Sequence, residues 1–345
     1  MNIPGAHKIK NLFLAARARF PQNEAIILAY HRIFAPKTDP QLLCTSPRNF
    51  EEHLKIISQH YNPISLQALG KATKVNKVPN KSIVITFDDG YVDNLLYAKP
   101  LLEKYRIPAT IFVSTHYVNK KKEFWWDELE RIILLAPALP EKLSLSINKK
   151  EYTWLLTNQK KHNQHLQKWD VLQKPKNDSH RLYLDLHTLL KPLSFEKKEI
   201  ILQKLASWAR VQNKARHNYH VASHEELIKL SRSPFIEIGS HTVTHSNLAA
   251  QTQEKQSYEI TQSKKYLENI IKKPVNSFSY PFGTHNDIGT KLPSMVKKTG
   301  YALATANYPN LVTKRTDPFL LPRYLVRNWD GKTFYKQVEK WFNGE

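Results

Sequence analysis

Apolar runs alternate with helix-spaced segments along most of the chain. Short runs rich in β-branched residues predict strands buried on both faces, and they cover residues 24–31, 82–87, 107–115, 235–241, 275–283 and 301–306. Between and after them, apolar residues recur every three or four positions, which predicts helices over residues 50–60, 91–105, 251–273, 291–300 and 334–342. This alternation predicts a parallel sheet or barrel of the α/β class.

The alternation is interrupted between residues 119 and 219. This stretch is rich in Lys, Asn, Gln and His, yet it has its own apolar periodicity. It predicts a hairpin around Asn148 and Lys149 and an amphipathic helix over 194–212. We therefore expect residues 119–219 to form an inserted basic subdomain of mixed α/β structure, within a barrel built from 24–118 and 220–345.

The first 23 residues form a separate basic segment. Ile9, Leu12, Phe13, Ala16 and Phe20 have helical spacing, and lysines and arginines lie between them. This pattern predicts a basic helical arm, which either rests on an anionic membrane surface or packs on the domain. No run approaches the ~18–20 apolar residues of a membrane span, and no long apolar leader is present. These features favour a cytoplasmic location, in which the basic arm would allow peripheral contact with an anionic membrane.

The formal net charge of +22 and the single cysteine restrict the function further. One cysteine excludes a disulfide framework and a cysteine zinc site. The basic excess suits an anionic glycan, an anionic sugar carrier or a lipid surface. A nucleic-acid partner is not favoured, because no recognisable nucleic-acid-binding motif accompanies the charge.

Polar residues with catalytic chemistry follow three of the predicted strands. Asp88 and Asp89 follow one strand, His241 and His245 follow another, and His31 follows the first. In a parallel barrel the carboxyl ends of the strands share one face, where active sites form. A helical turn would place His241 and His245 on one side, and with one of the aspartates they could hold a divalent metal. The metal charge would offset the repulsion between the aspartates, and the second aspartate would be free to act as a base.

Two further motifs indicate contacts with a substrate. "FSYPFG" over 278–283 predicts a tight turn after a strand, which can present a backbone N–H to a developing oxyanion. Trp125 and Trp126 open the insertion and either stack on sugar faces or pack on the barrel rim. Asp127 and Glu128 follow them at a helix start, where the helix dipole alone explains acidic residues.

The order of "TFDDG", "HTVTH" and "YPFG" resembles the polysaccharide deacetylases with a NodB-type domain, carbohydrate esterase family 4. "YHRI", "RIPATIFV" and "LLPRYLV" agree with the resemblance, which covers residues 25–118 and 220–335. It implies a distorted (β/α) barrel, here with seven strands, and metal-dependent removal of an acyl group from a sugar.

Site residues follow from the resemblance by position. Asp89, His241 and His245 would bind one divalent ion, zinc foremost, with Co²⁺, Ni²⁺ or Mn²⁺ as alternatives. Asp88 would be the general base, the N–H of Phe282 would bind the oxyanion, and Tyr280 of the same turn would contact the substrate.

The chain departs from the family pattern at the general acid. Many members carry a histidine in a late leucine-rich motif, whereas "LLPRYLV" offers Arg323. His31 is the candidate proton donor, with a buried structural histidine as the alternative. Arg323 would orient Asp88, bind a substrate phosphate or pair with a carboxylate in the core.

These features together predict a hydrolase that removes an N-acetyl or N-formyl group from a sugar. The substrate would be a cell-surface glycan or its lipid-linked precursor. A C–N hydrolase acting on a non-sugar amide and a catalytically silent glycan-binding module are the alternatives. The complete set of Asp88, Asp89, His241 and His245 argues against the silent module, which needs no water-activating base.

Overall fold

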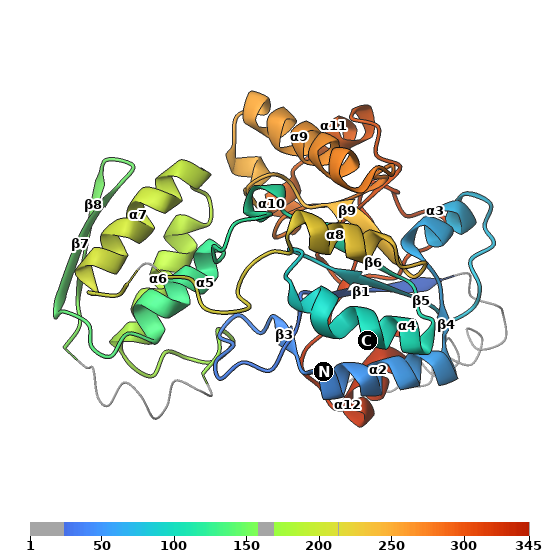
Figure 1. Cartoon of the computed structure of the whole chain (residues 1–345), viewed down its shortest axis with the longest axis horizontal. Coiled ribbons are helices and arrows are strands. Elements are labelled where there is room, and N and C mark those ends of the chain that lie inside the picture. Colours follow the sequence, from blue (N-terminus) through green and yellow to red (C-terminus); the bar gives the residue numbers. More distant parts are fainter. Residues whose placement is uncertain (1–23, 158–168, 213, 345) are drawn as a thin grey trace, which may run out of the picture.

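The computed structural model describes residues 24–157, 169–212 and 214–344. The predicted basic arm over 1–23 lies outside the described residues. The described chain forms a barrel and, beside it, a smaller lobe of helices with one hairpin (Figure 1). None of the described helices is both long enough and apolar enough to span a membrane.

The core of the fold is a curled sheet in which the seven main strands are parallel. The strands lie in the order β11 (Leu303–Thr305), β10 (Ser277–Ser279), β9 (Ile236–Ser240), β6 (Ala109–Val113), β5 (Ser82–Phe87), β1 (Ala25–Tyr30) and β12 (Tyr324–Leu325). A short strand, β4 (Asn62–Pro63), pairs with the start of β5. Every residue of β1 and β5 is buried, as expected for parallel strands that are covered on both faces. The predicted distorted barrel of seven strands is confirmed.

Irregular backbone brings the two edges of the sheet together. β12 pairs with β1 at one edge, while the residues just before it reach β11 at the other. The Leu321 N–H donates to Ala304 O (2.9 Å), and the Ala306 N–H donates to Leu321 O (2.8 Å). The barrel is therefore closed by one segment that pairs with both edge strands.

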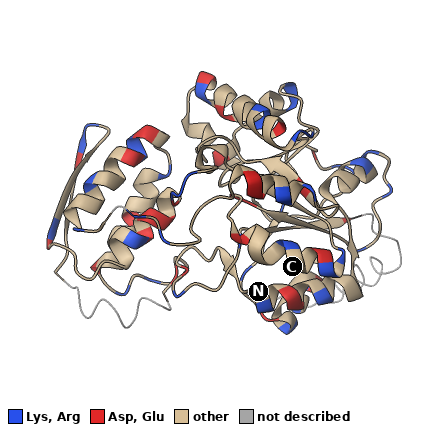
Figure 2. Ribbon diagram, viewed as in Figure 1, with Lys and Arg blue, Asp and Glu red and all other residues tan. Residues whose placement is uncertain are grey.

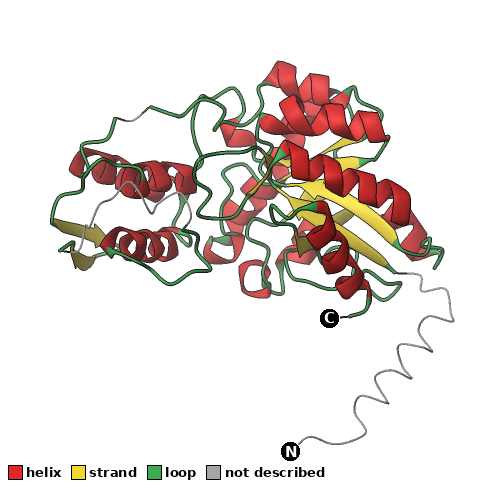
Figure 3. Ribbon diagram, turned by 90° about the horizontal axis from the view of Figure 1, so that it is seen from below, coloured by secondary structure: helices red, strands yellow, loops and turns green. Residues whose placement is uncertain are grey.

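Helices cover the outside of the barrel (Figure 3). They are α2 (Pro47–His60), α3 (Leu66–Lys74), α4 (Lys99–Tyr105), α8 (His224–Ser231), α9 (Gln253–Ile271), α10 (His285–Ile288), α11 (Leu292–Lys298) and α12 (Gly331–Phe342). Capping residues mark where these helices begin and end. The Ser46 side chain caps the start of α2, and Lys272, two residues before Pro274, caps the end of α9. The helix predicted over 91–105 is instead divided into a π-helical turn (Asn94–Ala98) and α4.

The interrupting stretch forms the smaller lobe. It contains α5 (Trp125–Leu129), a π-helical turn (Glu130–Leu134), the hairpin strands β7 (Lys142–Ile147) and β8 (Lys150–Leu155), α6 (Asp178–Leu190) and α7 (Phe195–Trp208). Asn148 and Lys149 form the hairpin turn with φ values of 51° and 67°, which suits a two-residue turn of the I′ kind. Figure 2 shows acidic as well as basic positions on the helices of this lobe. The division of the chain at residues 119 and 219 remains our proposal.

Candidate active site

A pocket of about 290 Å³ opens at the carboxyl ends of the barrel strands. Its wall includes residues that lie one or two positions beyond the ends of β1, β5, β9, β11 and β12, namely His31, Asp88, Asp89, His241, Asn307 and Arg327. The stretch 119–219 contributes a second wall through Trp126, Val171, His187 and Lys191. The site therefore lies between the barrel mouth and the lobe.

Asp89, His241 and His245 form one compact group in this pocket. Their candidate ligand atoms all lie within 4.8 Å of one another. The Asp89 Oδ1 atom is 3.5 Å from His241 Nε2 and 3.3 Å from His245 Nε2. All three side chains are buried. The structure thus brings together the three residues that the sequence suggested as metal ligands.

The state of these groups fits a divalent cation. Asp89 Oδ1 is buried without a hydrogen-bond partner in the described structure. His241 Nδ1 lies 2.8 Å from the Ser279 carbonyl, so it carries the proton and leaves the Nε2 lone pair directed at Asp89. Burial lowers the pKa of both His241 and His245, which favours neutral imidazoles able to ligate. Burial and the neighbouring Asp88 charge raise the pKa of Asp89, and a cation would offset both effects.

The backbone explains how two adjacent aspartates take different directions. Asp89 has a φ of 73° and Gly90 a φ of 77°, so the chain turns sharply at the end of β5. A Cβ at Gly90 would lie 3.0 Å from the Val113 side chain, and the positive φ would strain it further. Gly90 is therefore required by the turn that separates the Asp88 and Asp89 side chains.

The two histidines lie on an irregular loop, and the predicted helical turn is wrong. Thr242 and His245 have φ values of 66° and 53°, outside the right-handed helical region. The His245 N–H donates to Thr242 Oγ1 (3.0 Å) within the loop. The imidazole rings lie 4.8 Å apart, so the loop achieves the pairing that a helix was expected to provide.

Glu259 of α9 holds this loop through hydrogen bonds to its carboxylate. Its carboxylate accepts the N–H groups of Val243 and Thr244, each at 2.8 Å, and the Thr244 hydroxyl at 2.6 Å. The Ser246 hydroxyl donates to the same carboxylate at 3.4 Å. Glu259 is fully buried. Sequence reasoning missed this residue, although its spacing with Ser263, Leu267 and Ile271 places it on the buried face of α9, which is an unusual position for a glutamate.

Asp88 is paired with Arg323 by two parallel hydrogen bonds. Arg323 Nη1 and Nη2 donate to Asp88 Oδ1 (2.8 Å) and Oδ2 (2.6 Å). Ser279 Oγ also donates to Oδ1, at 3.2 Å. Burial alone would raise the pKa of Asp88, but the charges of Arg323 and His241 outweigh it and hold that pKa well below its usual range. Of the roles considered for Arg323, this geometry agrees with orienting Asp88. Arg323 is 1% exposed, which leaves it out of reach of a substrate phosphate.

His31 and Phe282 both face the pocket. Burial lowers the pKa of His31 to about 4, so its imidazole is neutral near pH 7. Phe282 has a φ of 61° in the tight turn after β10. Within the described residues its N–H makes no hydrogen bond to the protein. That N–H remains a candidate oxyanion donor.

The predicted substrate contacts are only partly placed at the pocket. Trp126 lines it, with its ring 4.6 Å from the His245 ring. Tyr280 is 1% exposed, and its hydroxyl donates to Phe319 O (3.1 Å). Trp125 is 2% exposed and packs against His187 at 4.8 Å between ring centroids. Tyr280 and Trp125 are therefore packing residues in the described structure, because surrounding protein atoms cover both side chains.

Comparisons with known proteins agree with this geometry. Residues 75–134 and 207–304 match the family described as Polysaccharide deacetylase. A poly-beta-1,6-N-acetyl-D-glucosamine N-deacetylase of Staphylococcus aureus is 23% identical over 339 residues, which cover 91% of this chain and 86% of that protein.

Two solved structures share the fold. IcaB from Ammonifex degensii superposes with a TM-score of 0.54 at 14% identity, covering 92% of this chain and 97% of that chain. The Streptococcus pyogenes deacetylase PplD, solved in complex with acetate, gives a TM-score of 0.53 at 15% identity, covering 91% and 98%. The sequence match and the shared fold together support a NodB-type polysaccharide deacetylase.

Proposed function

We propose that this chain is a metal-dependent hydrolase that removes an N-acetyl or N-formyl group from an amino sugar. The substrate would belong to a cell-surface glycan or to its lipid-linked precursor. The observation that carries the proposal is the Asp89, His241 and His245 group beside an Arg323-held Asp88, in one pocket at the barrel mouth. The relatives named as glycan N-deacetylases support the choice of a sugar amide.

The three ligand residues would hold a single divalent ion, with Zn²⁺ as the first candidate. Two imidazoles and one carboxylate leave positions open for other ligands, which is typical of a catalytic site. When bound, such an ion would supply Lewis-acid chemistry by acidifying water and polarising an acyl carbonyl.

Asp88 would accept the proton of the attacking water. Its pairing with Arg323 keeps it ionised and fixes the plane of its carboxylate. The same pairing makes Asp88 a weak base, so efficient proton transfer requires a strongly acidified water. Arg323 would thus set both the orientation and the basicity of Asp88.

The remaining pocket groups would act on the acyl carbon and the leaving nitrogen. The Phe282 N–H would stabilise the oxyanion that forms on the acyl oxygen. The proton that Asp88 accepts from the water would pass to His31, which is neutral near pH 7, and from His31 to the leaving amine, so that both groups return to their starting states. Bond cleavage would release a free amine on the sugar together with acetate or formate.

The test is hydrolysis by the purified full chain loaded with Zn²⁺. N-acetylated and N-formylated glucosamine oligomers would be offered, and both the free amine and the released acid would be measured. We expect equal amounts of the two products, and no product after chelation or in Asp89→Asn. Hydrolysis of simple non-sugar amides but of no oligomer would instead support the alternative C–N hydrolase.

A further inference from the structure

Arg327 provides a cation on the pocket wall with unused hydrogen-bonding capacity. It lies two residues beyond β12 and is half-buried. Its Nη1 donates to the Leu42 carbonyl at 2.8 Å. Throughout the described ranges of the chain, no carboxylate forms an ion pair with its guanidinium. A guanidinium carries five N–H donors, so most of its donors face the pocket or solvent.

The other buried arginines around this site are paired. Arg32 pairs with Asp93, Arg131 with Glu123, Arg216 with Glu130, and Arg323 with Asp88. An unpaired cation that is partly removed from water carries a desolvation cost. Burial accordingly lowers the pKa of Arg327, and the negative charges of Asp39 and Asp170 oppose this only from a distance. Arg327 is thus an exception among arginines that the fold otherwise neutralises.

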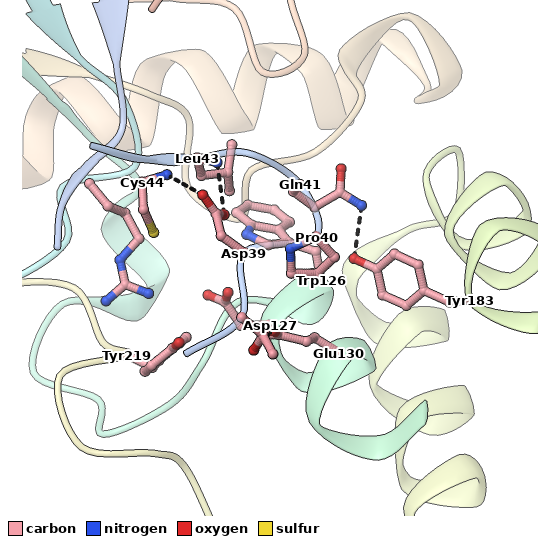
Figure 4. A pocket seen from close by; sticks show the side chains of 12 residues that line it. Asp39, Pro40, Gln41, Leu43, Cys44, Trp126, Asp127, Glu130, Tyr183 and Tyr219 are labelled. Atoms are coloured by element: carbon pink, nitrogen blue, oxygen red, sulfur yellow. Dashed lines mark hydrogen bonds between the residues drawn. The ribbon is translucent and has the colours of Figure 1, made fainter. Parts of the chain in front are cut away.

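The carbonyl that holds Arg327 belongs to a well-ordered loop over 39–44. The Asp39 carboxylate accepts the N–H groups of Leu43 and Cys44, each at 2.9 Å (Figure 4). Gln41 Nε2 donates to the Tyr183 hydroxyl of α6 at 2.8 Å, which ties the loop to the lobe (Figure 4). The guanidinium is therefore held in place before any ligand arrives, which lowers the entropy cost of binding.

The other strong charges of the pocket are already balanced. Arg323 neutralises Asp88, and Lys191 lies 2.8 Å from an Asp287 carboxylate oxygen. Two of the three groups of the proposed metal site are neutral imidazoles, and Asp89 would be balanced by the ion itself. Arg327 thus remains a cation without an ion-pair partner among the described residues, and an anion of a ligand can balance its charge.

We propose that Arg327 binds an oxyanion of the substrate, either a carboxylate or a phosphate. The oxyanion would be carried by the sugar that loses its acyl group or by the unit next to it. Guanidinium matches both groups through paired, parallel hydrogen bonds. This inference rests on the proposed function and narrows it to acidic glycans or phosphorylated sugar carriers.

The test compares three N-acetylglucosamine tetramers of the same length: a neutral one, one with a carboxylate and one with a phosphate ester. Calorimetric affinity and acetate release would be measured with the Zn²⁺-loaded full chain and with Arg327→Gln and Arg327→Lys. Arg315→Gln is the control, because Arg315 is exposed and lies at the end of the barrel opposite the pocket. Its position follows from Val312, three residues earlier, which pairs with Ala25 at the start of β1.

The wild-type protein should bind an anionic tetramer more tightly than the neutral one. Loss of a charged hydrogen-bond pair predicts that Arg327→Gln weakens anionic binding about 10- to 100-fold more than neutral binding. Arg327→Lys should restore part of that difference, and Arg315→Gln should keep the wild-type preference. The tetramer with the larger selective loss identifies the oxyanion as carboxylate or phosphate.

Equal wild-type affinity for all three tetramers would overturn the inference. An equal loss of affinity for all three in Arg327→Gln would also overturn it, because it would indicate a structural role. The binding measurement separates this inference from the proposed function. Anion selectivity that depends on Arg327, without acetate release from any tetramer, would support the inference and count against N-deacetylation.

Discussion

Asp88 and Arg323 meet through two hydrogen bonds of 2.8 and 2.6 Å, although they lie 235 positions apart in the sequence. The pair links the end of β5 to the segment that closes the barrel. Both side chains are buried, at 4% and 1% exposure, so the ion pair is part of the core as well as of the pocket. In the mechanism that we propose, catalysis and folding therefore depend on the same contact.

The two adjacent aspartates should respond differently to removal of their charge. Asp88→Asn should retain metal but turn over about 10²–10⁴-fold more slowly, because a positioned base is lost. Asp89→Asn should lose metal affinity, because the buried ligand oxygen becomes neutral. Metal content and single-turnover rates of both variants check this, and thermal melts confirm that each is folded. The opposite pattern of metal retention would reverse the two roles.

His241→Ala should lose bound zinc and activity together. The Nδ1 proton of His241 is fixed by the Ser279 carbonyl, so Nε2 is prepared to ligate. Zinc content after dialysis at micromolar zinc is the measurement. His60→Ala on α2 serves as a control on the outside of the barrel. Full zinc occupancy in His241→Ala would exclude this ligand assignment.

Arg323→Met should destabilise the fold as well as slow the reaction. Removing one partner of a buried ion pair leaves the other uncompensated, which typically costs about 3–5 kcal/mol. The double variant Asp88→Asn with Arg323→Met should recover part of that loss, because it no longer buries a lone charge. Urea unfolding of both single variants and the double variant measures the coupling. Strictly additive losses would show that the pair makes no joint contribution.

Glu259→Gln should weaken metal binding without touching a ligand. The variant loses the charge and one acceptor that hold the loop carrying His245, and supporting residues of this kind typically affect metal affinity about 10- to 100-fold. Competition with a zinc chelator measures the affinity. Glu254→Gln is the matched control, since Glu254 is exposed on the same helix. Equal affinity in both variants would mean that the loop holds its shape without Glu259.

His53 should make the fold sensitive to acid. Burial lowers its pKa from 6.5 to about 4, while the unfolded chain keeps the ordinary value. Between these values the unfolded state binds the extra proton, so the free energy of unfolding falls as the pH drops from 6.5 toward 4. At about 1.4 kcal/mol per pKa unit, the upper bound is about 3 kcal/mol. Urea midpoints against pH for wild type and His53→Gln check this, and parallel curves would contradict it.

The sequence predicted the site best where short apolar strands are followed by polar residues at one face of the barrel. β1, β5 and β9 are short buried strands, so His31, Asp88, Asp89 and His241 could be placed on one face, because the carboxyl ends of parallel barrel strands share it. The hairpin turn at Asn148 and Lys149 was also predictable, since local backbone preference decides it.

Contacts between distant segments could not be predicted in the same way. The loop of His241 and His245 is hydrogen-bonded to Glu259, a carboxylate from another element, and two of its residues have positive φ values that the apolar pattern does not indicate. Tyr280 and Trp125 were expected at the pocket because aromatic residues suit sugars. Which side of a turn or helix faces a cavity is decided by tertiary packing.

The pocket wall formed by Val171, His187 and Lys191 has an evolutionary consequence. These residues lie between the two stretches that match the family, 75–134 and 207–304, whereas Asp88, Asp89, His241 and His245 lie inside them. The residues proposed to act in bond cleavage and part of the pocket wall are therefore encoded in separate portions of the gene. Substitutions in the intervening portion would therefore change the wall of the proposed substrate pocket and leave the proposed metal and base residues unchanged.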